Sequence, residues 1–373
     1  MSAAPPPEAV EGSSREPEVD LIIAVHTVER PIERAVGSVL ADAHTPARVL
    51  VVCHGVSVDA IAARLGPLAD DPRVRLLPFV DGIASPTGPF NHGLDAATSR
   101  FTAVMGSDDE LERGAVDSWL AIARRDGADI VIPRLLLASG ASMRTPPTRP
   151  FRSRGLDGAR DRLAYRTAQL GLVARERFAD LRFTTGISSG EDIAYGLRLW
   201  FSGAPISFDR RGPAYLIHSD ATDRTTFTRR SVAHDFTFLD EAIDPAWVST
   251  LPPSSRTAIA VKLLRTHLLD ALRSRLLHVD DPESLSTDDR ASFAEVVRRI
   301  LAVAPNAADI VSRRDRRILR ALVAEPFDVA VIAAELRGRG SLVHPSNSMS
   351  AELRHTLHRE APPRFFAAIK LAP

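Results

Sequence analysis

Apolar and polar positions follow a regular order in the first part of the chain. A continuous apolar run at 19–25 (VDLIIAV) is typical of a buried strand, and apolar residues at helical spacing follow over 32–40. Further apolar runs at 48–53 and 74–79 flank a helical pattern at 58–68. Strands that alternate with helices predict a parallel, doubly wound α/β sheet with right-handed crossovers.

The pattern continues beyond a Gly/Pro-rich loop at 81–89, which we interpret as a lip over a ligand site. A segment at 139–154, rich in Ser, Thr, Pro and Arg, predicts an irregular excursion over the surface. The periodicity predicts helices at 91–99, 114–124, 156–169 and 193–201, and strands at 101–105, 129–137, 205–208 and 215–218.

The carboxy-terminal third has a different pattern, because no strand is predicted after residue 254. Residues 256–277 carry one apolar stripe of a long helix, and further helices are predicted at 287–303, 307–324 and 327–337. The expected organisation is a disordered tail at 1–18, an α/β domain at 19–243, and an all-helical region at 254–373. The stripe would suit acceptor docking, contact with a membrane surface, a homo-oligomer, or plain intramolecular core.

Composition narrows the class of protein. Acids and bases balance at 47 each, so nothing indicates a nucleic-acid partner. The single cysteine, Cys53, excludes internal disulfides and favours a reducing compartment. We find no apolar run of about 18 residues and no signal peptide, and therefore expect a cytoplasmic protein.

Candidate chemistry lies where the strand at 101–105 ends, because Gly106 and Ser107 lead directly into two carboxylates, Asp108 and Asp109. Ligands bind at the carboxyl ends of strands in open α/β sheets, and paired carboxylates suit a divalent cation with a diphosphate. The alternative is that Ser107 and Asp108 cap a helix starting near Leu111. These residues support both interpretations equally.

Several segments, taken in order, resemble family 2 glycosyltransferases with the nucleotide-diphospho-sugar (GT-A) fold. The resemblance covers about residues 19–226, and its most specific part is Ser-Asp-Asp followed by Gly-Glu-Asp. The matching segments are VDLIIAVHTVERPIERAVGSVL, VLVVCHG, NHGLDAATSRFTAVMGSDDEL, GEDIAYGLRLWFSG and YLIHSD.

The resemblance implies a role for individual residues. Asp109 would bind a divalent cation, Mn²⁺ or Mg²⁺, with His218 completing the metal or diphosphate site, and Asp192 would be the general base. We expect the start of a helix to hold Asp192 ionised. The alternative is a purely structural role, in which Asp192 is an ordinary first-turn acid of a helix capped by Ser188 or Ser189. The implied donor-binding residues are Thr27, Arg30, His54, Asn91, Asp108 and Glu191.

Two departures from the family pattern stand out. Gly106 occupies a position where many relatives have a first acid, and Cys53-His54 replaces an acid pair that contacts the base or ribose. The second departure leaves the nucleotide open.

The resemblance implies a metal-dependent, inverting transfer of a sugar from a nucleotide-diphosphate donor to an acceptor hydroxyl. By analogy the acceptor would be a cell-envelope glycan, a polymer or a lipid-linked glycan, reached in the cytoplasm or at the inner face of the membrane. Two alternatives are a nucleotidyltransferase, which usually has a Gly-rich phosphate loop that residues 26–30 lack, and a non-catalytic scaffold with a decayed donor site.

Overall fold

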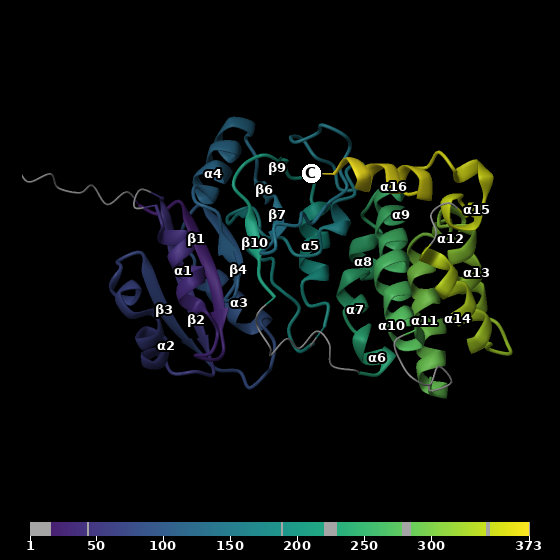
Figure 1. Ribbon diagram of the computed structural model, residues 1–373, viewed down its shortest axis with the longest axis horizontal. Coiled ribbons are helices and arrows are strands. Elements are labelled where there is room, and N and C mark those ends of the chain that lie inside the picture. The colour runs from purple at the N-terminus through teal and green to yellow at the C-terminus, as the bar shows by residue number, and fades with distance from the viewer. Residues whose placement is uncertain are drawn as a thin grey trace, which may run out of the picture.

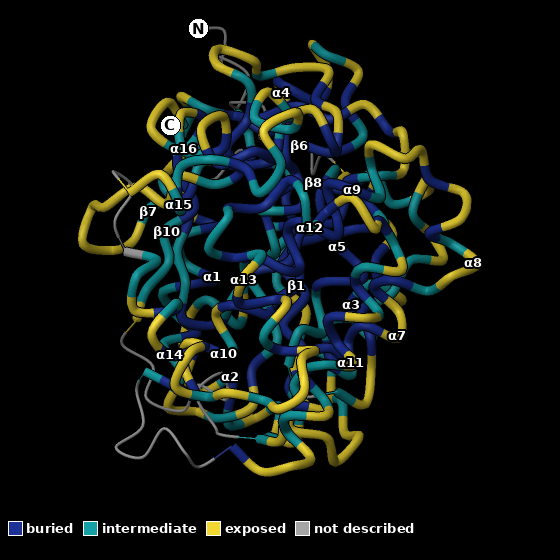
Figure 2. Tube along the Cα trace, turned by 90° about the vertical axis from the view of Figure 1, so that its right-hand side faces the viewer, coloured by how far each residue is buried: buried dark blue, intermediate teal, exposed yellow. Residues whose placement is uncertain are grey.

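The computed structural model describes residues 16–42, 45–187, 189–219, 230–277, 285–340 and 344–372. An amino-terminal part built on a sheet lies beside a bundle of helices formed by the later part of the chain (Figure 1). Buried stretches run through the interior at elements such as β1 and β8, whereas the exposed stretches lie around the periphery (Figure 2).

A seven-stranded sheet forms the amino-terminal part, with the strand order β3-β2-β1-β4-β8-β6-β9. Its pairs are parallel except those made by β8, which runs antiparallel to both neighbours. This confirms the predicted mostly parallel α/β class. The strands are β1 (Val19–Val25), β2 (Ala47–His54), β3 (Val74–Phe79), β4 (Phe101–Gly106), β6 (Ile130–Pro133), β8 (Leu172–Ala174) and β9 (Ile206–Asp209).

Helices cover both faces of this sheet because alternate side chains of a strand point to opposite sides. Leu21 and Ile23 of β1 lie in one apolar core with α1, α2 and α4, whereas Ile22 lies in a second core with α5 and the end of α3. The helices are α1 (Ile32–Leu40), α2 (Val58–Leu65), α3 (Thr87–Ala96), α4 (Ala115–Asp126) and α5 (Ile193–Trp200).

A small second sheet has the order β5-β10-β7, with β5 (Glu110–Leu111), β10 (Tyr215–Ile217) and β7 (Leu135–Leu137). The single strand predicted at 129–137 is therefore divided at Arg134, so that β6 and β7 belong to different sheets. The small sheet brings β10 alongside the residues that follow the acidic strand.

The helix predicted at 156–169 is wrong. This segment is a series of turns with one short 3₁₀ helix at Leu163–Tyr165, and Arg162 has a left-handed backbone with φ 50°. Arg166 is buried and donates to the carbonyl oxygens of Thr145 at 3.0 Å and Pro133 at 2.7 Å. Because buried guanidinium groups must find acceptors, tertiary hydrogen bonding overrides the helical periodicity.

The later part of the chain is helical, as predicted. Its elements are α6 (Val232–Asp235), α7 (Leu239–Ala242), α8 (Pro245–Val248), α9 (Pro253–Lys262), a π-helical segment (Leu263–Leu268), α10 (Leu269–Leu277), α11 (Thr287–Val303), α12 (Ala307–Ile310), α13 (Arg313–Leu322), α14 (Val329–Arg337), α15 (Pro345–Ser348) and α16 (Pro362–Leu371). The helix predicted at 307–324 is broken before α13, where the Ser312 side chain accepts a hydrogen bond from the Asp315 amide. Among the described helices, none has the length and apolar character needed to cross a bilayer.

One apolar core joins the two parts. It contains Val232 and Leu239 of α6 and α7, the interior of α9 and α11, and also Ile193 and Leu197 of α5. Helices before residue 243 thus share a core with helices after residue 254. The domain boundary expected near 243–254 stays a prediction.

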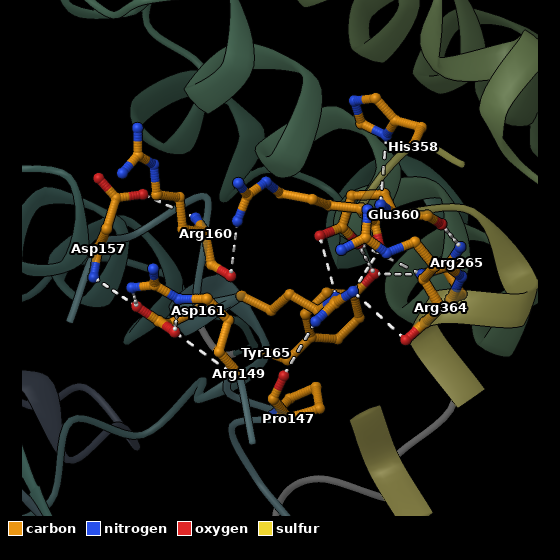
Figure 3. Close-up of polar contacts among 12 residues, drawn as sticks. Pro147, Arg149, Asp157, Arg160, Asp161, Tyr165, Arg265, His358, Glu360 and Arg364 are labelled. Atoms are coloured by element: carbon orange, nitrogen blue, oxygen red, sulfur yellow. Dashed lines mark hydrogen bonds and ion pairs between the residues drawn. The ribbon is translucent and has the colours of Figure 1, made fainter. Parts of the chain in front are cut away.

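A buried ionic cluster also links the parts (Figure 3). The Glu360 carboxylate, 1% exposed, accepts a hydrogen bond from the Tyr165 hydroxyl at 3.0 Å. It also lies 3.5 Å from the guanidinium groups of Arg162 and Arg265. Burial raises the pKa of Glu360, and the two arginines oppose that shift. Glu360 thus balances two cations that are themselves buried.

We expect Glu360→Ala to lower the free energy of unfolding by about 3–5 kcal/mol, because it leaves two buried guanidinium groups without a counter-charge. Denaturant unfolding measures the change. The control is Glu295→Ala, which removes an exposed i,i+3 partner of Arg298 and should cost less than about 1 kcal/mol. Equal effects of the two variants would contradict the role assigned to the cluster.

Candidate active site

A cleft of about 690 Å³ opens where β1, β2 and β4 end. Parallel pairing places the carboxyl ends of these strands at one edge, since Val25 is opposite Cys53 and Ala24 is opposite Gly106. The predicted site residues that line the cleft are Arg30, His54, Asp108, Asp109, Glu191 and Asp192. The two carboxylates expected to bind metal and to accept a proton therefore face one cavity.

The Asp109 carboxylate is held by hydrogen bonds to both of its oxygens. The Tyr215 hydroxyl donates to Oδ2 at 2.6 Å, and the His218 backbone amide donates to Oδ1 at 3.1 Å. The same hydroxyl accepts a hydrogen bond from the Gly106 amide at 3.0 Å. Burial and the neighbouring Asp109 charge raise the pKa of Tyr215 well above its usual value, so the hydroxyl remains a donor. The small sheet thus fixes this acid.

The helix-cap interpretation of Ser107 and Asp108 is wrong. Strand β5 follows the acids, and α4 begins only at Ala115, after Gly114 with φ 81°. The acids therefore lie in a turn between two strands.

Gly106 explains one departure from the family pattern. A Cβ atom at this position would lie 2.6 Å from Asp109 Oδ2 and 3.2 Å from Asp108 Oδ1. Both carboxylates fold back over the glycine, and a side chain there would displace them. Glycine at position 106, where many relatives have an acid, thus leaves space that the Asp108 and Asp109 carboxylates occupy.

Asp108 is paired inside the cleft with an arginine of the first polar turn. Arg30 Nη1 lies 3.0 Å from Asp108 Oδ2, and the Arg34 guanidinium donates to the Asp108 carbonyl oxygen. The structure therefore brings the predicted donor-binding residues Arg30 and Asp108 together. Thr27 is in the same turn, but its hydroxyl accepts from the Glu29 amide at 3.3 Å and does not line the cleft.

His54 makes a hydrogen bond at the cleft wall, with Nε2 2.7 Å from Asp81 Oδ1. Its ring also packs against Phe79, with centroids 5.6 Å apart. Burial works against the Asp81 charge, yet hydrogen bonds from the Ile83 amide and the His54 ring lower the pKa of Asp81 overall. An acid is therefore present beside His54, supplied by the loop that follows β3.

Glu191 and Asp192 enter the cleft from the start of α5. Asp192 is the N-cap residue, but its side chain makes no capping hydrogen bond. Burial raises the pKa of Asp192, and the positive charge of Lys262 opposes the shift. The expected effect of the helix start is thus outweighed, and a raised pKa suits a proton acceptor. Ser188, named as one alternative cap, lies outside the described residues.

Besides Thr27, two predicted site residues do not line the cleft. The Asn91 amide exchanges hydrogen bonds with the Phe183 backbone at 3.0 and 2.9 Å, and so supports a wall residue. The His218 ring lies 3.1 Å from Glu110, and its backbone amide donates to Asp109. The roles expected for Asn91 and His218 stay predictions.

Asp109 is the described residue best suited to hold a divalent cation. No group of three or more His, Cys, Asp or Glu side chains in the described part of the chain is arranged to bind a metal. A Mg²⁺ ion, however, needs only one or two carboxylates when substrate phosphates supply other ligands. Asp109 lines the cleft, where such a cation shared with substrate phosphates would lie.

The sequence reasoning missed three residues that shape the cleft. Tyr215 orients Asp109, Phe183 forms a wall and stacks on Tyr195 with centroids 4.2 Å apart, and Lys262 lies behind Asp192. Only Lys262 gave a signal, because it is one of two lysines in an arginine-rich chain.

The family model described as glycosyl transferase family 2 matches residues 20–179. The succinoglycan biosynthesis protein ExoO of Rhizobium meliloti (strain 1021) is 34% identical over 130 residues. This match spans 34% of the chain and only 36% of that relative's length.

Solved structures of S. aureus TarS are similar over most of the chain. Residues 1–349 of TarS in complex with UDP-GlcNAc superpose with a TM-score of 0.67 at 14% identity, covering 86% of this chain and 91% of TarS 1–349. TarS 1–349 without a named ligand gives a TM-score of 0.61, covering 88% and 93%. At this identity the similarity shows the fold.

The α/β part therefore has the GT-A fold of nucleotide-diphospho-sugar transferases. Residues 20–179, less than half of the chain, match the model of glycosyl transferase family 2.

We expect Tyr215→Phe to lower the free energy of unfolding by about 1–3 kcal/mol, because the Gly106 amide and the Asp109 carboxylate lose a buried partner. The matched control is Tyr195→Phe, since no described residue hydrogen-bonds to the Tyr195 hydroxyl. Chemical denaturation of both variants measures the difference. If Tyr215→Phe were as stable as Tyr195→Phe, the hydroxyl would not be what holds Asp109.

Proposed function

We propose that this protein is a metal-dependent, inverting glycosyltransferase that moves a sugar from a nucleotide-diphosphate donor to an acceptor hydroxyl. One observation carries the proposal: Asp109, at the end of β4, and Asp192, at the start of α5, line a single cleft of sugar-accommodating size. The family of residues 20–179 gives independent support. The catalytic unit would be 19–243, with the helical region completing the wall behind Asp192.

The proposed reaction is a direct displacement at the anomeric carbon. Asp192 takes the proton of the acceptor hydroxyl as its oxygen forms the new bond to that carbon. The bond from the anomeric carbon to the donor phosphate oxygen breaks, and the nucleoside diphosphate leaves with the electron pair. One base and one displacement give inversion.

On the donor side, Asp109 would hold a divalent cation, Mn²⁺ or Mg²⁺, together with the diphosphate oxygens. When bound, the cation would neutralise negative charge on the leaving diphosphate. Asp108 and Arg30 lie beside this position and would contact the ribose or sugar. Their ion pair would have to rearrange or share its groups when the donor enters.

His54 and Asp81 would lie at the nucleoside end of the donor site. The resemblance puts an acid at the position of His54, and here the carboxylate of Asp81 is 2.7 Å from that ring. We therefore propose that the pair replaces the missing acid and that its preferred base differs from that of relatives. The TarS complex with UDP-GlcNAc supports a nucleotide-sugar donor in this fold and leaves the base of this chain's donor open.

The acceptor we propose is a cell-envelope glycan or a related polymer, because the relative ExoO is named for succinoglycan biosynthesis. A cytoplasmic location and peripheral contact with a membrane surface remain predictions from the sequence.

A donor screen tests the proposal. Full-length protein with Mn²⁺ is titrated calorimetrically with UDP, GDP, CDP and dTDP, and mass spectrometry follows hydrolysis of the corresponding nucleotide-sugars. We expect one nucleotide to bind and one donor to be consumed. Absence of binding to every nucleotide would instead favour a non-catalytic scaffold, and release of pyrophosphate from a nucleoside triphosphate with a sugar phosphate would favour a nucleotidyltransferase.

Asp109→Asn should weaken binding of that nucleotide diphosphate in Mn²⁺ by more than about tenfold, since it removes the carboxylate charge expected to hold the cation. Calorimetry with and without Mn²⁺ measures the loss. The control Asp95→Asn removes an exposed acid that pairs with Arg182 and should bind like the parent protein. Unchanged Mn²⁺-dependent affinity in Asp109→Asn would remove Asp109 from the metal site.

Asp192→Asn should reduce turnover by about 10²–10⁴-fold and leave donor binding nearly intact, because an amide cannot accept the acceptor's proton. Single-turnover kinetics and calorimetry give the two quantities separately. Loss of donor affinity of the same size as the loss of rate would instead show that Asp192 binds the donor.

A further inference from the structure

A buried lysine lies behind the Asp192 side of the cleft. Lys262, the last residue of α9, is 1% exposed. The chain has only one other lysine, Lys370, which is exposed on α16. Burying an ammonium group costs free energy unless a charge or a hydrogen-bond acceptor compensates for it.

The π-helical segment that follows α9 supplies one partner. The Lys262 ammonium group donates to Nε2 of His267, five residues later. In an α-helix, residues i and i+5 point about 140° apart, because each residue advances about 100°. The wider π turn, with its i to i+5 hydrogen bonds, places the two side chains on one face. The irregular turn is therefore what creates this pair.

Packing holds Lys262 near the start of α5. Ile193, next to Asp192, shares one apolar core with Val261 and Leu263, the neighbours of Lys262 in sequence. Phe238, the residue before α7, packs against the His267 ring at 5.3 Å between centroids, and a Cβ atom at Gly190 would lie 2.7 Å from Phe238. The loop carrying Glu191 and Asp192 thus rests directly on the helical region.

The titratable neighbours of Lys262 and Asp192 in the described part of the chain include Glu191 and His267. Lys262 and Asp192 interact electrostatically across the wall of the cleft. Glu191 lies beside Asp192 and interacts with Arg230. Burial and the nearby ammonium group lower the pKa of His267 well below its usual value, so this ring is a neutral acceptor. Lys262 is therefore the cation that counters burial of Asp192.

We infer that Lys262 is a positioning residue, whose buried ammonium group keeps the Asp192 carboxylate ionised and ready to accept the proton of the acceptor. This inference rests on the role proposed for Asp192. It assigns the helical region a part in the reaction, because α9 and the π turn present the ammonium group.

The choice of lysine has a measurable cost. Burial lowers the pKa of Lys262 to about 8, and the Asp192 carboxylate opposes that shift. The unfolded chain binds this proton up to about pH 10.4, so stability rises as the pH increases from about 8 to 10.4. Below pH 8 the folded protein carries the full cost of the buried charge.

The test uses Lys262→Met, Lys262→Arg and the control Lys370→Met in the full-length chain. With the donor found in the screen, we expect the acid limb of the pH-rate profile to move to higher pH in Lys262→Met. Turnover at pH 6, relative to its own optimum, should fall about tenfold, as expected for loss of one nearby positive charge. Lys262→Arg should keep the limb in place, and Lys370→Met should be unchanged. Reduced turnover in Lys262→Met with an unmoved limb would show a merely structural role and overturn the inference.

A second measurement needs no turnover, so it separates this inference from the proposed function. The Tm is measured from pH 6 to 10 for Lys262→Met, Asp192→Asn and the double variant. Lys262→Met should gain more Tm at pH 7 than at pH 10, and the effects of the two substitutions should be non-additive. Additive effects at every pH would overturn the coupling even if the protein proves to be an active transferase. Coupling in a protein that consumes no donor would support the contact and reject the proposed reaction.

Discussion

The pair of hydrogen bonds made by the Tyr215 hydroxyl is the constraint on which the cleft depends. It fixes the turn after β4 through the Gly106 amide and orients Asp109 through Oδ2. The small sheet exists around this contact, since β10 carries the tyrosine and pairs with β5 directly after the acids. The carboxylate is thereby preorganised before any ligand arrives.

The two parts of the chain meet at α5. One side of this helix packs against the sheet through Leu199 and Trp200, and the other side enters the helical core through Ile193 and Leu197. Its first residues carry the proposed base, so the position of that base depends on both cores. The helical region therefore packs behind α5 and supports the residues that line the cleft, although the cleft lining itself ends at Ile217.

The sequence predicted the sheet, its carboxyl edge and the four cleft acids, because long apolar runs and strand ends leave strong local patterns. The GT-A resemblance and the α/β class are confirmed. Local patterns could not reveal what tertiary contacts decide. The segment that contains Arg162 and Arg166 forms irregular turns despite its helical periodicity. Tyr215 reaches Asp109 from a strand that is distant in sequence. The π-helical turn could not be recognised, because the apolar stripe of 256–277 looks the same with or without it. The role expected for His218 at the metal site stays a prediction, and the contact of its backbone amide with Asp109 could not be foreseen from the sequence.

The distance along the chain between Tyr165 and Glu360 bears on how the protein is made. These residues are 195 positions apart, yet they meet in one buried cluster. While a ribosome is still producing the carboxy-terminal segment, Arg162 and Tyr165 lack the carboxylate that they enclose in the finished molecule. This cluster can therefore form only after residue 360 has been synthesised, and until then its arginines and Tyr165 stay accessible to chaperones and proteases.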